Sequence, residues 1–173
     1  MSNINKEKYK IALSLSVGAT SGLNFLEDCL YDNKASSNYC IRSINILLSY
    51  YVELLLKSRV VMKGCFSNQS ELKNKLTELS HNLIKIGKEL GSMELSKIGI
   101  KEITKNDTKY IIETTNNIKI KTEDFTSIRY DYLFGKQRKT SNSEYAEINS
   151  YIEELLKILR HIKKSNEDEK WIK

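Results

Sequence analysis

The chain has 173 residues and a mass of 20.0 kDa, which is about the size of one domain with a single hydrophobic core. Hydrophobic residues make up 40% of the sequence and charged residues 29%, which excludes a disordered chain, and no apolar run is long enough to cross a bilayer, which excludes a membrane-spanning protein. The net charge of +6 permits an anionic partner such as RNA or DNA but does not require one, because net charge governs solubility and non-specific association rather than fold.

The first predicted helix runs from Lys8 to Tyr31, where apolar residues recur at helical spacing along one face. Small residues lie in its middle, among them Gly18 and Gly22, and they allow a second helix to approach closely at a cost of about 1 kcal/mol per glycine relative to alanine. A second helix is predicted from Tyr39 to Lys63. This stretch is the most hydrophobic of the chain, so we expect it to form the central helix of a bundle.

A third helix is predicted from Gln69 to Leu90, where leucine and isoleucine alternate at spacings of four and three, and Gly91 is expected to end it. Between Lys97 and Asp124 the apolar period changes to two. This alternation is typical of a β-hairpin, with its turn at Thr115-Asn116-Asn117, and the isoleucines before the hairpin indicate a third strand.

The spacing of four and three returns between Ser143 and Lys164 and predicts the last helix, followed by a frayed tail at about residues 165–173. The expected fold is therefore mainly α. It is a single domain over residues 1–173, an antiparallel bundle of four to five helices with a β-hairpin inserted at about residues 99–123, before the last helix.

The N-terminal sequence MSNINKEKYK lacks the apolar segment and cleavage site of a secretory signal, so we expect a cytoplasmic protein. The chain contains three cysteines, Cys29, Cys40 and Cys65, which have neither CxxC spacing nor a nearby histidine. This pattern predicts no disulfide and no zinc site, and we expect the three thiols to be buried. No cofactor and no metal are expected.

Two segments carry candidate polar chemistry. Glu53 and Lys57 are four residues apart on the most hydrophobic helix, in the order that favours an intrahelical ion pair. If both are buried, the cost of removing them from water requires a further charged partner, for which Arg129 is the candidate. His81 is predicted to point away from the leucines of its helix, either as a surface residue or as a catalyst, and Asn82 beside it is a candidate for orienting a ligand.

A basic cluster follows a group of aromatic side chains near residue 130. Its members are Lys136, Arg138 and Lys139. Cations beside stacking surfaces are suited to single-stranded nucleic acid, but the same pattern is also typical of a solvated loop next to buried aromatics. The sequence leaves both interpretations open.

Three short motifs occur in a fixed order between about residues 37 and 162. The first is YYVELLLKSRVVMKG, with Glu53 and Lys57; the second is LTELSHNLIKIGKELG, with His81 and Asn82; the third is FTSIRYDYLFG, with Arg129, Tyr130 and Asp131, ahead of a final amphipathic helix. In this order the motifs resemble the HEPN superfamily of small helical domains. The resemblance implies an antiparallel helical bundle that forms a homodimer and acts in bacterial toxin–antitoxin pairs or antiviral defence.

Active members of this superfamily are metal-independent ribonucleases, in which an arginine is followed by a histidine after a spacer of about four to six residues. Counting from Arg129 leads to Phe134, Gly135 and Lys136, so the resemblance does not extend to the ribonuclease motif. Cleavage of RNA through its 2′-hydroxyl requires a proton acceptor and donor with a pKa of about 7, usually histidine. We therefore expect Arg129 to be structural, either pairing with Glu53 or capping backbone carbonyls.

The expected function is a non-catalytic HEPN-like module that binds a partner protein or an RNA or nucleotide ligand. The alternative is a divergent ribonuclease that uses Arg129 with His81, or a lysine and tyrosine pair near Arg129. A third possibility is an interaction protein that makes no contact with nucleic acid.

Overall fold

The computed structural model describes residues 3–31, 38–107, 109–124 and 142–170. This part of the chain is mainly helical, as predicted, and carries a small antiparallel sheet of three strands. The helices are α1 (Asn3–Tyr31), α2 (Asn38–Lys63), α3 (Gln69–Leu79), α4 (Leu83–Lys97) and α6 (Asn142–Lys170). The strands are β1 (Ile100–Asn106), β2 (Lys109–Thr114) and β3 (Lys119–Glu123).

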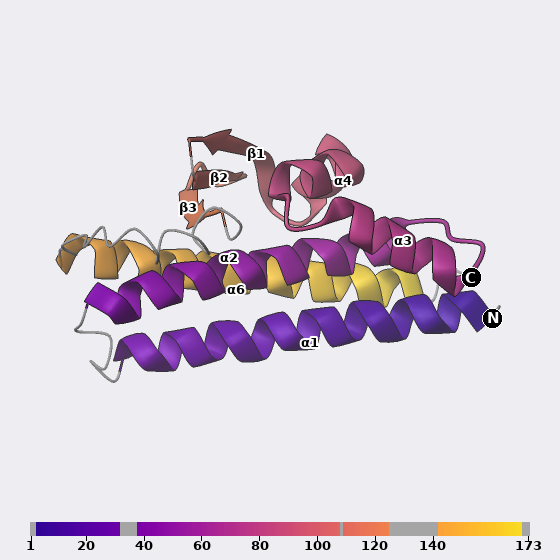
Figure 1. Cartoon of the computed structure of the whole chain (residues 1–173), viewed down its shortest axis with the longest axis horizontal. Helices are drawn as coiled ribbons and strands as arrows, with labels where there is room; N and C mark the ends of the chain where they lie inside the picture. The colour runs from indigo at the N-terminus through magenta and orange to yellow at the C-terminus, as the bar shows by residue number, and fades with distance from the viewer. Residues whose placement is uncertain (1–2, 32–37, 108, 125–141, 171–173) are drawn as a thin grey trace.

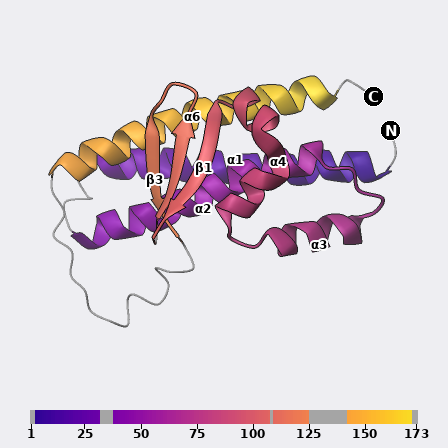
Figure 2. The same ribbon diagram turned by 90° about the horizontal axis from the view of Figure 1, so that it is seen from above.

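The three long helices α1, α2 and α6 lie side by side and contact one another (Figure 1). Helix α1 runs antiparallel to both α2 and α6. The sheet, α3 and α4 lie on the opposite side of α2 and α6 from α1, so α2 and α6 form the middle of the molecule (Figures 1 and 2).

A continuous hydrophobic core connects the long helices to the sheet. Helix α2 contributes residues on several of its sides, including Leu48 and Leu55, in agreement with the central position that its composition predicts. The strands contribute Ile112 and Ile120, which face each other across the β2–β3 pair. A smaller cluster, of Ala12, Val61 and Leu72, joins the N-terminal part of α1 to α2 and α3.

The predicted third helix is wrong in its extent. It breaks after Leu79, where Ser80 has a φ of 51°, and a new helix begins at Leu83 with Asn82 as its N-cap. The predicted helix end at Gly91 is confirmed: its φ of 75° and ψ of 160° are not helical, and α4 has a kink there, after which a second helical segment runs to Lys97. Leu79 and Leu83 keep the spacing of one helical face across the break, so the apolar pattern alone does not reveal it.

The tail and the cysteines also differ from expectation. Helix α6 continues to Lys170 instead of fraying at about residue 165. Asn166 in this part of the helix is buried and hydrogen-bonds Ser58 and Arg59 of α2. Cys65 is exposed and Cys29 is partly exposed, so neither is the buried thiol that we expected. The side chain of Cys40 lies outside the described residues.

Gly22 lies where α1 packs tightly against a side chain of α2. A Cβ atom at this position would overlap the ring of Tyr51, whereas a Cβ at Gly18 would meet only Leu54, at 3.6 Å. We therefore expect Gly22→Ala to lower the free energy of unfolding by about 1–2 kcal/mol. The matched change Gly18→Ala should be neutral or stabilising, because alanine is favoured over glycine in a helix. Urea unfolding followed by circular dichroism measures both, and equal effects would contradict this account of α1–α2 packing.

Candidate functional site

Three residues from two of the sequence motifs meet at one buried carboxylate. Oε1 of Glu53 accepts a hydrogen bond from Nζ of Lys57 at 2.7 Å, and Oε2 lies 2.7 Å from Nδ1 of His81. We call Glu53, Lys57 and His81 the Glu53 cluster. The spacing within α2 predicted the pair of Glu53 and Lys57. The partner of His81 is also Glu53, which lies 28 positions earlier in the chain.

The break between α3 and α4 places His81 against α2. Ser80, with its positive φ, turns the backbone out of α3, and the Asn82 side chain accepts a hydrogen bond from the backbone N–H of Lys85 at 3.0 Å, which starts α4. His81 therefore occupies the short connection between two helices, whose directions differ (Figure 2). Asn82 is the N-cap of α4: its side-chain oxygen accepts a hydrogen bond from the helix backbone, whereas the sequence suggested that it orients a ligand.

The side chains of the Glu53 cluster become more exposed from Glu53 in the core to His81 at the surface. The side chain of Glu53 is 4% exposed and that of Lys57 12%, whereas that of His81 is 39% exposed. A carboxylate that hydrogen-bonds Nδ1 fixes the orientation of an imidazole ring. The arrangement can therefore present an oriented histidine at the surface, which is able to hydrogen-bond a ligand or transfer a proton.

A second set of polar residues lies beside the Glu53 cluster. Asp124, which is buried, accepts a hydrogen bond from Nζ of Lys105 at 2.7 Å, and the same ammonium lies 5.3 Å from the ring centroid of Tyr110. Burial raises the pKa of the Tyr110 hydroxyl, and the negative charges of Asp124 and Glu53 raise it further. The hydroxyl of Tyr110, on β2, is therefore influenced by the charges of both Asp124 and Glu53. This interaction links the Glu53 cluster to the sheet.

The sequence did not identify Lys105, Tyr110 and Asp124 as members of a polar site. The inward position of Tyr110 on an alternating strand was a usable signal, because β2 alternates buried and partly buried residues. Asp124 and Lys105 carried no such signal, since they are brought together by the pairing of β1 and β3 with β2.

The remaining predicted site residues are Arg129, Tyr130, Asp131, Lys136, Arg138 and Lys139. All six lie outside the described residues, so the pairing of Arg129 with Glu53 and the nucleic-acid role of the basic cluster remain predictions.

A separate buried network joins α2, α4 and α6. Arg59 donates to Glu94 at 2.7 Å and to Asn166 at 3.1 Å, and Asn166 in turn donates to Ser58 at 3.2 Å. Burial opposes ionisation of Glu94, but hydrogen bonds from Lys97, Arg59 and Lys63 and the charge of Arg59 lower its pKa to about 2. Glu94 is thus an ionised counterion for a buried guanidinium, which is a structural role.

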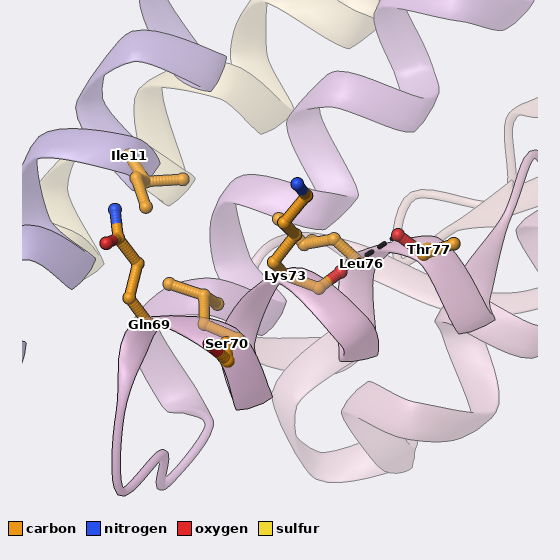
Figure 3. Close-up of a pocket in the computed structure, with 7 residues that line it drawn as sticks. Ile11, Gln69, Ser70, Lys73, Leu76 and Thr77 are labelled. Atoms are coloured by element: carbon orange, nitrogen blue, oxygen red, sulfur yellow. Dashed lines mark hydrogen bonds between the residues drawn. The ribbon is translucent and has the colours of Figure 1, made fainter.

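An open groove of about 550 Å³ lies between α1 and α3, and none of its lining residues belongs to the Glu53 cluster or to the Arg59 network (Figure 3). Its lining residues are Ile11, Gln69, Ser70, Leu72, Lys73, Leu76 and Thr77. The hydroxyl of Thr77 donates to the carbonyl of Lys73 at 3.0 Å. Lys73 is the sole titratable side chain in this lining, so the groove offers no pair of groups for acid–base chemistry.

Comparisons of the chain with protein-family models, with curated proteins and with solved structures gave no match. Within the described residues, no three side chains among histidine, cysteine, aspartate and glutamate are grouped closely enough to hold a metal ion. No helix in this part of the chain combines the length and apolar character needed to cross a membrane.

Proposed function

We propose that this chain is a HEPN-like helical bundle that binds RNA as a homodimer, in the cytoplasm of a bacterium and within a defence or toxin–antitoxin system. The observation that supports the proposal best is the meeting of two separate motifs at one carboxylate. Glu53 and Lys57 come from the motif in α2, and His81 comes from the motif at the start of α4. Glu53 and His81 are 28 positions apart in the sequence, so their contact is tertiary and local spacing does not imply it.

Charge favours RNA over an uncharged ligand. The chain carries 28 lysines and arginines against 22 acidic residues, and the basic cluster of Lys136, Arg138 and Lys139 follows Asp124 by fewer than twenty positions. A protein that neutralises phosphates releases counterions, so its binding weakens as salt concentration rises. His81 adds an oriented, partly exposed imidazole that can donate a hydrogen bond to a phosphate or a base.

The binding test uses a fluorescently labelled single-stranded RNA of mixed sequence, with anisotropy measured at low and at moderate salt. Wild-type protein is expected to bind at low salt and to weaken at moderate salt. Replacing Lys136, Arg138 and Lys139 together with alanine should weaken binding at least about tenfold and flatten its salt dependence. Lys88→Ala, which removes an exposed lysine of α4, is the control and should bind nearly as wild type does. Absence of wild-type binding at low salt, or equal binding by the triple variant, would refute the proposal.

A second candidate function is the divergent endoribonuclease, because the contact between His81 and Glu53 is of the kind that prepares a histidine for general acid–base catalysis. Incubation of end-labelled RNA with wild type, Arg129→Ala, His81→Ala and Lys88→Ala separates the two functions. A binding module leaves the RNA intact in all four samples. Cleavage by wild type and Lys88→Ala that is lost in Arg129→Ala and His81→Ala would establish the ribonuclease instead.

A further inference from the structure

The outward face of α1 is unusually apolar for a surface helix. Helix α1 buries Ala19, Leu23 and Leu26 toward the other long helices. On its opposite side Leu13 is 46% exposed and Val17 49%. Phe25, on the same side, is 56% exposed. Figure 1 shows that no other element of the described residues lies against this side of α1. Residues 11–26 contain no charged side chain at all, whereas a surface helix ordinarily carries charges on its solvent face.

Six exposed residues of α1 are arranged symmetrically about the level of residue 19. Lys10 and Asp28 lie nine residues before and after this level, Leu13 and Phe25 lie six, and Val17 and Ser21 lie two. All six are exposed. At 3.6 residues per turn, Lys10, Val17, Ser21 and Asp28 follow one narrow line along the helix, and Leu13 and Phe25 lie on either side of it.

Such an arrangement is complementary to a second copy of itself. A two-fold axis through the level of residue 19 sets two α1 helices antiparallel, so that each Lys10 faces Asp28 of the second copy. Leu13 of one copy and Phe25 of the other then lie at the same level, on opposite flanks of the contact. Opposite charges then meet at both ends of an uncharged strip. From Lys10 to Asp28 this strip is about 27 Å long, at about 1.5 Å per residue.

We propose that the outward face of α1, from Lys10 to Asp28, is the surface through which two copies of this chain associate, with their α1 helices antiparallel. The inference rests on the homodimer in the proposed function and names its surface. Charge complementarity selects a second copy as the occupant, because a partner with like charges at these two positions would meet repulsion at both ends. Lys10 also lies 3.6 Å from Glu7 within its own helix, but an exposed pair of this kind is weak and leaves Lys10 available to a second partner.

The test is sedimentation velocity of the full chain over a range of concentrations. Wild type is expected to dimerise, and Val17→Glu, which places two carboxylates near the axis, is expected to be monomeric. Lys10→Asp and Asp28→Lys each put like charges opposite one another at both ends, and each should raise the dissociation constant at least about tenfold. The double variant Lys10→Asp/Asp28→Lys restores opposite charges and should return to within about threefold of wild type. Lys88→Asp, on α4, is the control and should dimerise normally.

The surface assignment is overturned if wild type is monomeric at every concentration, if Val17→Glu dimerises as wild type does, or if the double variant is as weak as the single variants. The charge variants change exposed residues alone, and their circular dichroism shows whether they are folded. RNA binding is measured on the same samples. Monomeric protein that still binds RNA would refute the dimer surface while the RNA-binding function stands, and a normal dimer that binds no RNA would support the surface while refuting that function.

Discussion

Replacing Glu94 with leucine is expected to lower the free energy of unfolding by about 3–5 kcal/mol. The side chain of Arg59 is 1% exposed and that of Glu94 11% exposed, and they are joined at 2.7 Å. The substitution leaves the guanidinium of Arg59 inside the protein without its carboxylate, and a charge of this kind costs more than the loss of a neutral contact. Urea unfolding followed by circular dichroism, with the slope of the transition checked for a constant value, measures the change.

A double-mutant cycle isolates the pair from its surroundings. Arg59→Met removes the cation, but Glu94 keeps its ion pairs with Lys63 and Lys97. The loss of stability in Arg59→Met should therefore be smaller than that in Glu94→Leu. The double variant Arg59→Met/Glu94→Leu fills the site with apolar groups and should recover most of the loss, because a buried ion pair contributes little net stability beyond a well-packed apolar replacement. Additive losses in the double variant would show that the two side chains do not act as a pair.

Glu53→Leu should be the next most damaging substitution, with a loss of about 3 kcal/mol, near the lower end of the range for a broken buried ion pair. Lys57 and His81 both lose the carboxylate that they share, but His81 is partly exposed and can turn to water. Glu113→Leu is the matched control, since Glu113 also holds two lysines, Lys101 and Lys119, on the protein surface. Because both lysines are well exposed, the control should lose much less stability than Glu53→Leu.

The contrast between these two glutamates is the decisive measurement. Thermal or urea unfolding of Glu53→Leu and Glu113→Leu under identical conditions compares them directly. A loss in Glu53→Leu as small as that in Glu113→Leu would mean that the Glu53 cluster is solvated and does not hold His81 in place.

Local periodicity accounts for the parts of the fold that the sequence predicted. Apolar residues at helical spacing predict the helix from Tyr39 to Lys63 and the helix from Ser143. Alternation of apolar and polar residues predicts the strands on either side of Thr115-Asn116-Asn117. Glu53 and Lys57 were paired correctly for the same reason, since one helical turn separates them.

Tertiary contacts account for what the sequence analysis missed. The break at Ser80 is hidden by Leu79 and Leu83, which keep helical spacing, and the polar Ser-His-Asn run was its sole local sign. The end of α6 is polar and reads as a frayed tail, yet Asn166 is held by residues 107 and 108 positions earlier. No pattern within a short window can reveal a partner so distant in the chain.

Asn166 has a consequence for how the protein is made. During synthesis Arg59 leaves the ribosome long before Asn166, and its guanidinium must remain hydrated or transiently paired until the last helix arrives. The nascent chain therefore cannot complete its interior before position 166 has been translated, and a ribosome that stalls earlier would release a polypeptide with an open seam beside α2.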